Sequence, residues 1–246
     1  MHCIPSALPR SATTHRYGPA RSNFAELFLP DGDGPHPVAV VIHGGFWKAQ
    51  YGRKLMHDLC ADLAAHGWAA WNLEYRRLGL RSGGGFPNTL DDVAAGIDAL
   101  ADHAAPLDLN RVVAIGHSAG GHLALWAATR EDARVPVTAV AAQAAVSDLR
   151  MAWDLRLSRG VVVRFLGGKP EEIPDRYAAA SPAERLPLRV PALLVHGARD
   201  VNVPLSMSEH FAAISGAELR VFDDEAHMGH IEPGNPMWRA VREWIR

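Results

Sequence analysis

The sequence predicts an α/β fold in which helices cover both faces of a doubly wound, mostly parallel sheet. Short apolar segments recur along the chain, and helix-length amphipathic segments separate most of them. The apolar segments are hydrophobic nearly throughout, which is typical of strands buried on both faces. The length of 246 residues fits one domain over residues 1–246 with a sizeable core.

Six strands are expected from apolar segments that are rich in β-forming residues. They cover residues 38–42, 69–73, 112–115, 137–141, 192–195 and 218–222. A helix is expected over residues 53–66, because leucines recur every four positions and Gly67 follows. A second helix begins at Asp91, and a third follows residue 118. The last helix should bury one face formed by Trp238, Val241 and Ile245.

Three segments interrupt this alternation. Residues 81–87 contain three consecutive glycines and should form a flexible loop. Residues 147–188 insert about forty positions between two strands, which is typical of a small lid. Residues 1–16 are rich in proline and polar residues and are expected to form a loose N-terminal arm.

The composition excludes several classes of protein. There are 25 Lys and Arg against 27 Asp and Glu, a formal net charge of -2, and no block of like charges, so neither nucleic acid nor a membrane surface is an expected partner. The first thirty residues lack the apolar core of a signal peptide. Cys3 and Cys60 are too few for a disulfide scaffold or a thiolate zinc site. A cytoplasmic protein with no metal and no cofactor is therefore expected.

A nucleophilic serine is the strongest chemical signal. The sequence GHSAGG over residues 116–121 directly follows the strand expected at 112–115 and precedes a helix. Ser118 would occupy a strained turn with positive φ, which is sterically possible when Gly116 and Gly120 flank it two positions away. The alternative is a glycine-rich packing turn in which the serine caps the helix.

A second glycine pair follows the strand expected at 38–42, in the sequence HGGFW over residues 43–47. Such a turn can direct backbone N–H groups at one point, as stabilisation of an oxyanion requires. The N–H groups of Gly45, Phe46 and Ala119 are the candidate oxyanion hole. The alternative is an ordinary turn at the end of a strand.

Serine needs a base and an orienting carboxylate to act as a nucleophile at neutral pH. Asp200 follows the strand expected at 192–195, and His227 follows the strand expected at 218–222. Ser118, Asp200 and His227 thus occur in the order serine, acid, histidine at strand ends that should share one sheet edge.

Other residues remain open for these roles. His230 could be the base in place of His227, and the orienting acid could be Asp148, Asp223 or Asp224. Glu74 and Arg76, at the end of a strand, are expected to pair and brace the sheet edge. Hydrogen bonds that hold neighbouring loops are the expected role of His43, His117, His122 and His196.

With these residues placed, the chain resembles the α/β-hydrolase superfamily and, within it, the kynurenine formamidase (arylformamidase) and carboxylesterase branch, which carries HGGxW and GxSxG elements. The resemblance extends from about Tyr17 to Pro233. It implies an α/β-hydrolase fold of about eight strands, a triad of Ser118, Asp200 and His227, and an oxyanion hole at Gly45 and Phe46. The chain departs from this branch directly after His227, where Met228 and Gly229 replace the usual phenylalanine and acidic residue.

The expected activity is hydrolysis of small carboxylic esters or amides through an acyl-enzyme on Ser118. Formyl and acetyl are the expected acyl groups, and N-formylkynurenine is the named candidate substrate. Acyl transfer by a biosynthetic acyltransferase, thioesterase or cyclase would use the same residues. A non-catalytic ligand-binding module on a hydrolase scaffold is the alternative from another class.

Overall fold

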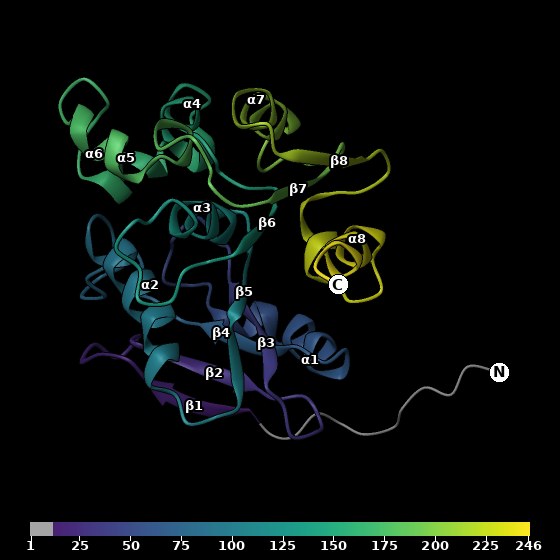
Figure 1. Ribbon diagram of the computed structural model, residues 1–246. Coiled ribbons are helices and arrows are strands. Elements are labelled where there is room, and N and C mark those ends of the chain that lie inside the picture. Colours follow the sequence, from purple (N-terminus) through teal and green to yellow (C-terminus); the bar gives the residue numbers. More distant parts are fainter. Residues whose placement is uncertain (1–11) are drawn as a thin grey trace.

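A computed structural model describes residues 12–246 and contains an eight-stranded sheet with helices on both faces (Figure 1). The strand order is β1-β2-β4-β3-β5-β6-β7-β8. Strands β1 and β2 run antiparallel to their neighbours, and all other neighbouring pairs are parallel. The predicted mostly parallel sheet of about eight strands is confirmed. The strands are β1 (Thr13–Arg16), β2 (Phe24–Phe28), β3 (His36–Ile42), β4 (Ala69–Leu73), β5 (Leu107–His117), β6 (Ala139–Gln143), β7 (Ala192–Gly197) and β8 (Glu218–Phe222).

Eight α-helices and five short 3-10 helices (η) are found in the described part of the chain. The α-helices are α1 (His57–Ala65), α2 (Asn88–Asp98), α3 (Ala119–Ala127), α4 (Leu149–Asp154), α5 (Val161–Leu166), α6 (Pro174–Ala180), α7 (Leu205–Ser215) and α8 (Pro236–Trp244). The 3-10 helices are η1 (Arg53–Met56), η2 (Ala99–Asp102), η3 (Leu157–Arg159), η4 (Pro182–Glu184) and η5 (His227–Ile231). None of these helices is both long enough and apolar enough to span a bilayer.

The sheet separates two hydrophobic cores. In β3, Val38, Val40 and Ile42 belong to the core shared with α2, α3 and the insertion, whereas Ala39 and Val41 belong to the core under α1 and α8. All five are fully buried. Both faces of a central strand must therefore be apolar, since side chains alternate between them. Each large apolar side chain buried in this way contributes roughly 1.5–3 kcal/mol.

The predicted inward face of the last helix is confirmed. Trp238 and Val241 are fully buried and Ile245, which caps α8, is 5% exposed. The Trp238 indole N–H donates to the Asp62 carboxylate at 2.7 Å, and Arg242 pairs with the same carboxylate at 2.8 Å. These bonds fix α8 against α1 on the same face of the sheet.

The N-terminal segment corrects one prediction. Residues 13–16 form β1 and pair with β2, so the expected loose arm over residues 1–16 is wrong for this part. Backbone pairing along Phe24–Phe28 outweighs the polar composition of the segment. Residues 1–11, with Cys3, lie outside the described residues.

The insertion over residues 147–188 folds into α4, η3, α5, α6 and η4, and its α-helices lie together in Figure 1. It contacts the turn after β3. The Phe165 ring stacks on Trp47 with centroids 4.4 Å apart, and the Lys48 ammonium donates to the Ser158 hydroxyl at 2.7 Å. The insertion therefore buttresses this turn from the side.

Candidate active site

Ser118 lies between β5 and α3 with φ 57° and ψ -118°. Its N–H donates to the Gln143 carbonyl at 2.8 Å, and its carbonyl accepts from the His122 N–H at 3.1 Å. These bonds to β6 and α3 hold a backbone conformation that is costly for a residue other than glycine. The serine is therefore presented on a strained turn at the end of a central strand.

The flanking glycines are required by close backbone packing. A methyl group at Gly116 would overlap the carbonyl of Gly120, and one at Gly120 would overlap the carbonyl of Ile42 in β3. The turn can therefore form only where both positions lack a side chain. This is the physical basis of the GxSxG spacing.

Asp200 and His227 meet at the carboxyl ends of β7 and β8. The Nδ1 atom of His227 lies 2.6 Å from Oδ2 of Asp200. The other oxygen, Oδ1, accepts from the N–H groups of Asn202 at 2.8 Å and Val203 at 2.9 Å. The carboxylate is thus fixed by its own loop, and its contact with Nδ1 leaves Nε2 as the ring nitrogen from which a histidine base would accept a proton.

The environment of Asp200 keeps it ionised. Burial by itself would raise the pKa of this carboxyl group, but the neighbouring His196 and His227 and the Val203 N–H lower it well below its usual range. An ionised partner is what a histidine base needs, since it stabilises the imidazolium that forms when the histidine takes a proton.

His117 connects the serine turn to the histidine loop. Its Nε2–H donates to the His227 carbonyl at 3.0 Å, and the two rings lie 4.5 Å apart. Complete burial lowers the pKa of His117 to about 3, with the charge of His227 acting in the same direction. His117 is therefore neutral and adds no positive charge beside the imidazole of His227.

Ser118 and His227 line one pocket of about 120 Å³, but they are not hydrogen-bonded to each other. The Ser118 hydroxyl oxygen has no hydrogen-bond partner among the described residues. In enzymes without bound substrate such bonds are often long and shorten only in the complex. The pocket is lined by Gly45, Phe46, Tyr51, Leu55, His117, Ser118, Asn202, His227 and Met228.

The candidate oxyanion turn has left-handed backbone at three consecutive residues, with φ 108° at Gly45, 49° at Phe46 and 56° at Trp47. Gly45 and Phe46 line the same pocket as Ser118. Within residues 12–246, the N–H groups of Gly45, Phe46 and Ala119 donate to no protein group. Three unpaired donors beside a serine hydroxyl are suited to binding a negatively charged oxygen.

A buried pair behind this turn was not predicted. The His43 Nδ1 atom lies 2.8 Å from the Gly44 carbonyl oxygen, and its Nε2 lies 3.0 Å from Oε1 of Glu74. The Gly44 carbonyl and the Gly45 N–H belong to one planar peptide, so this contact fixes the direction of that N–H. Glu74 and His43 belong to the loops after β4 and β3, which are adjacent in the sheet but distant in sequence, so no local motif announces them.

The expected pair between Glu74 and Arg76 is wrong. Arg76 forms a two-pronged bond with Asp92 of α2, with its shortest contact at 2.7 Å. Glu74 instead contacts His43 and Arg77. The prediction assumed that residues two apart at a strand end share one side of the sheet. The chain leaves β4 at Leu73, however, so Glu74 and Arg76 lie beyond the strand and do not follow this alternation.

The alternative bases and acids lie outside this arrangement. His230 is fully buried, does not line the pocket, and its ring nitrogens have no partner in the described chain. Asp148 caps α4 by accepting from the Arg150 and Met151 N–H groups at 2.9 and 3.0 Å. Asp224 pairs with Arg199. Neither of these two carboxylates is hydrogen-bonded to His227, whereas Asp200 is.

The insertion over residues 147–188 does not cover this pocket as the expected lid would. None of the residues that line the pocket belongs to it. Phe165 instead packs against Trp47, behind the oxyanion turn. Tyr51 and Met228, which do line the pocket, remain 40% and 50% exposed.

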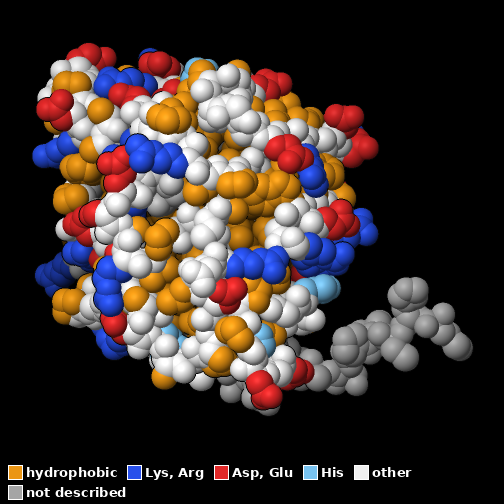
Figure 2. Space-filling view, in the orientation of Figure 1, with side chains coloured by type: hydrophobic (Ala, Val, Ile, Leu, Met, Phe, Trp, Pro, Cys, Tyr) orange, Lys and Arg blue, Asp and Glu red, His pale blue; other side chains and the backbone are white. Residues whose placement is uncertain are grey.

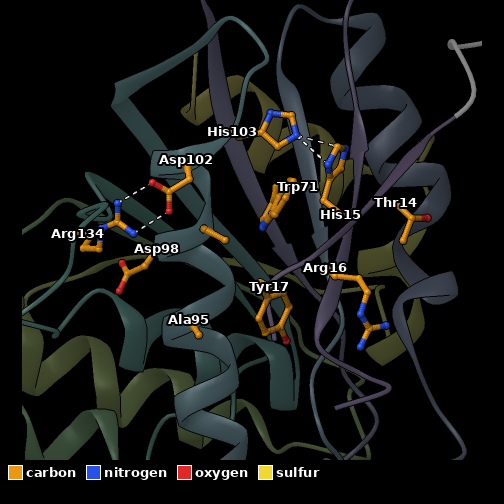
Figure 3. Close-up of a pocket in the computed structure, with 11 residues that line it drawn as sticks. Thr14, His15, Arg16, Tyr17, Trp71, Ala95, Asp98, Asp102, His103 and Arg134 are labelled. Atoms are coloured by element: carbon orange, nitrogen blue, oxygen red, sulfur yellow. Dashed lines mark hydrogen bonds and ion pairs between the residues drawn. The ribbon is translucent and has the colours of Figure 1, made fainter. Parts of the chain in front are cut away.

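A larger groove of about 700 Å³ lies at the β1 edge of the sheet (Figure 3). Four of its polar side chains are paired with one another, Asp102 with Arg134 at 2.9 Å and His103 with His15 at 3.1 Å. It contains neither Ser118 nor His227. The smaller pocket is therefore the candidate active site, because the reactive groups lie there.

On the face drawn in Figure 2, acidic and basic side chains are interspersed, in keeping with the net charge of -2.

Comparison with known proteins places the chain among esterase-like sequences. The family model BD-FAE matches residues 26–214. The chain is 30% identical over 200 residues to esterase LipC of Mycobacterium tuberculosis, covering 72% of this chain and 47% of LipC. It is 25% identical over 237 residues to a probable isoprenylcysteine alpha-carbonyl methylesterase of Oryza sativa, covering 86% of this chain and 56% of that protein. The chain thus spans about half the length of these curated relatives.

Solved structures share the fold. A truncated carbohydrate esterase from gut microbiota superposes with a TM-score of 0.80 at 19% identity, covering 98% of this chain and 96% of the other. At this identity the likeness concerns the fold alone. Together with the sheet order and the helices on both faces, it identifies the fold as that of the α/β-hydrolases.

Proposed function

The chain belongs to the BD-FAE family, and from this we propose that it is a serine esterase that hydrolyses small carboxylic esters. The observation that carries the proposal is the shared pocket of Ser118 and His227, with His227 bonded to Asp200 at 2.6 Å. The esterase names of its relatives agree with this chemistry. The three groups come from a strained turn and from the ends of two other strands. A serine that only capped a helix would require neither the strained turn nor the two other groups.

In the proposed reaction, the Ser118 hydroxyl attacks the ester carbonyl while Nε2 of His227 accepts its proton. The imidazolium is stabilised by the Asp200 carboxylate and then gives the proton to the departing alcohol. In the second half, water attacks the acyl carbonyl while Nε2 of His227 accepts its proton. The bond between the acyl carbon and Ser118 Oγ then breaks, His227 returns the proton to Ser118, and the carboxylic acid leaves. Each half thus begins and ends with a neutral His227.

The tetrahedral intermediates carry a negative oxygen, and we assign its binding to the N–H groups of Gly45, Phe46 and Ala119. Their lack of protein acceptors supports this role. Loss of a single such donor typically costs about 3 kcal/mol of transition-state stabilisation. The bond from His43 to the Gly44 carbonyl would keep the Gly45 N–H in position throughout the cycle.

Pocket size supports a short acyl group. A volume of about 120 Å³ accommodates a few non-hydrogen atoms beside the reacting carbonyl. Acetyl and formyl groups fit this requirement. The HGGxW element makes N-formyl-L-kynurenine the first formamide to test, and ester hydrolysis is the broader proposal.

The test compares hydrolysis of 4-nitrophenyl acetate and N-formyl-L-kynurenine by wild type and Ser118→Ala. We expect serine-dependent turnover of the acetate, and a fluorophosphonate probe should label only the wild type. Turnover of the formamide with kcat/KM of about 10⁴ M⁻¹s⁻¹ or more would extend the activity to arylformamides. Undiminished activity in Ser118→Ala would overturn the proposal.

A further inference from the structure

A second pocket adjoins the Ser118 pocket. It has a volume of about 390 Å³ and is lined by Gln50, Tyr51, Gly52, Arg53, Lys54, Leu55, Glu74 and Arg77. Tyr51 and Leu55 line both pockets. These two side chains therefore form the boundary across which a substrate bound at Ser118 could extend.

The two pockets differ in charge. No Asp, Glu, Lys or Arg lines the Ser118 pocket, whereas three cationic side chains and one carboxylate line its neighbour. A substrate that occupies both would meet an uncharged site at its carbonyl and a positive site farther along. Such an arrangement selects for charge at a distance from the reacting bond.

Protein partners already occupy most of the charged groups in the second pocket. Arg53 pairs with Glu26 at 2.7 Å, and Arg77 donates to the carbonyls of Ala49 and Tyr51. The Glu74 carboxylate is buried, and both of its oxygens accept hydrogen bonds, from groups that include His43 and the Arg53 N–H. A ligand would therefore meet little of the negative charge of Glu74.

Lys54 is the exception. Its side chain is exposed, and among residues 12–246 its ammonium group has no hydrogen-bond or ion-pair partner. The three cationic side chains of this pocket thus carry more positive charge than the carboxylates of Glu74 and Glu26 balance. A free ammonium at the wall of a pocket is suited to bind an anionic group.

We propose that the pocket at Lys54 binds an anionic group, such as a carboxylate, on the part of the substrate that extends past Tyr51 and Leu55. This rests on the proposed esterase function of Ser118. It narrows the substrate class to esters with a negatively charged group remote from the scissile bond. Lys54 is then a specificity-determining residue, not a participant in the reaction.

The test uses pairs of esters that differ in one charge. For the alcohol side, 4-acetoxybenzoate is compared with 4-acetoxybenzamide. For the acyl side, the mono-4-nitrophenyl ester of adipic acid is compared with 4-nitrophenyl 5-carbamoylpentanoate. The measured quantity is the ratio of kcat/KM for the anionic ester to kcat/KM for its neutral match, at low ionic strength.

In wild type, we expect this ratio to exceed one in at least one pair. Lys54→Ala should lower it roughly two- to fivefold, the upper part of the range of an exposed ion pair. Lys54→Glu should lower it further, to below one. Lys169→Glu is the matched control, because it makes the same charge change at an exposed lysine that lines neither pocket.

The outcomes separate this proposal from the proposed function. If neutral esters are hydrolysed in a Ser118-dependent way and the ratio is the same in wild type, Lys54→Glu and Lys169→Glu, the anion site is refuted and the esterase stands. An equal fall in both charge variants also refutes it, because the effect is then one of net charge. Loss of all Ser118-dependent turnover in wild type would instead refute the esterase itself.

Discussion

The Asp200 carboxylate is buried, and yet its pKa is held low by the groups around it. Replacement by Asn keeps the shape but removes the charge, and it favours the imidazole tautomer with the proton on the wrong nitrogen. We expect Asp200→Asn to lower kcat by roughly three to four orders of magnitude, measured with 4-nitrophenyl acetate.

Asp148→Asn is the control for this change. Asn is as good a helix cap as Asp, and Asp148 makes no contact with His227. Its kcat should stay within about twofold of wild type. A large fall in Asp148→Asn with a small one in Asp200→Asn would assign the orienting role to Asp148.

In the proposed reaction, the Glu74 and His43 pair would act through the Gly44–Gly45 peptide. Glu74→Gln weakens the bond to His43 and so loosens the Gly45 N–H. Because this donor matters most in the transition state, we expect kcat to fall roughly 10- to 100-fold with KM little changed. Steady-state kinetics with 4-nitrophenyl acetate give both constants.

Glu26→Gln is a matched control, since Glu26 is also buried and pairs with Arg53 and His57 away from the oxyanion turn. It should lower stability without this selective effect on kcat. An equal fall of kcat in both variants would mean that Glu74 acts only by supporting the fold.

At the scale of elements, the contact of α3 with the end of β3 depends on a missing side chain. A methyl group at Gly120 would overlap the Ile42 carbonyl, so Gly120→Ala must push strand and turn apart. We expect a loss of about 3 kcal/mol or more in the free energy of unfolding. Urea denaturation followed by circular dichroism measures it.

Gly234→Ala provides the comparison, because nothing lies within 4 Å of a methyl group there. It should change the free energy of unfolding by less than about 0.5 kcal/mol. Similar effects at the two glycines would contradict the steric account of the serine turn.

The central strands could be predicted from their sequences, because strands buried on both faces are apolar nearly throughout. The buried strand β4 coincides with the segment expected at 69–73, and the partly exposed strand β8 with the segment expected at 218–222. The two antiparallel strands at the β1 edge could not be predicted. Thr13–Arg16 is polar, and Phe24–Phe28 contains the buried Glu26, which pairs with residues of η1 and α1. Their pairing depends on contacts that no short segment encodes.

The same limit applies to the candidate site. Ser118, the glycine pairs, Asp200 and His227 follow from spacing, since the ends of neighbouring parallel strands meet at one edge. The contact of Glu74 with His43 and the lining by Tyr51 and Leu55 depend on how separate loops pack, for which the sequence offers no periodic signal. The insertion at 147–188 was visible from its length, but not the side of the site on which it packs.

At the scale of the whole molecule, buried neutral histidines make stability depend on pH. Burial lowers the pKa of His117 to about 3 and of His122 to about 4, and that of His230 well below its usual value. In the unfolded chain an imidazole takes up a proton near pH 6.5. Between pH 6.5 and about 4 the unfolded state therefore binds more protons, and stability falls as the pH falls.

We expect the free energy of unfolding to decrease steadily from pH 7 to pH 5, measured by urea denaturation at each pH. His122→Gln can keep both hydrogen bonds, from Trp47 and to Ala180, but cannot be protonated. Its slope against pH should be smaller by up to about 1.4 kcal/mol per pH unit. Asp200 and Glu74, whose pKa values are lowered, add a further loss only at more acidic pH. An identical slope in wild type and His122→Gln would contradict this explanation.

The position of the insertion beside the oxyanion turn has a kinetic consequence. Because no part of residues 147–188 lines the Ser118 pocket, this insertion does not have to swing away before an ester can enter. We therefore expect no activation by a lipid–water interface of the kind that draws such an insertion away from a pocket. The rate should then follow dissolved monomeric substrate along a simple hyperbola, with no abrupt rise where the ester exceeds its solubility and forms droplets.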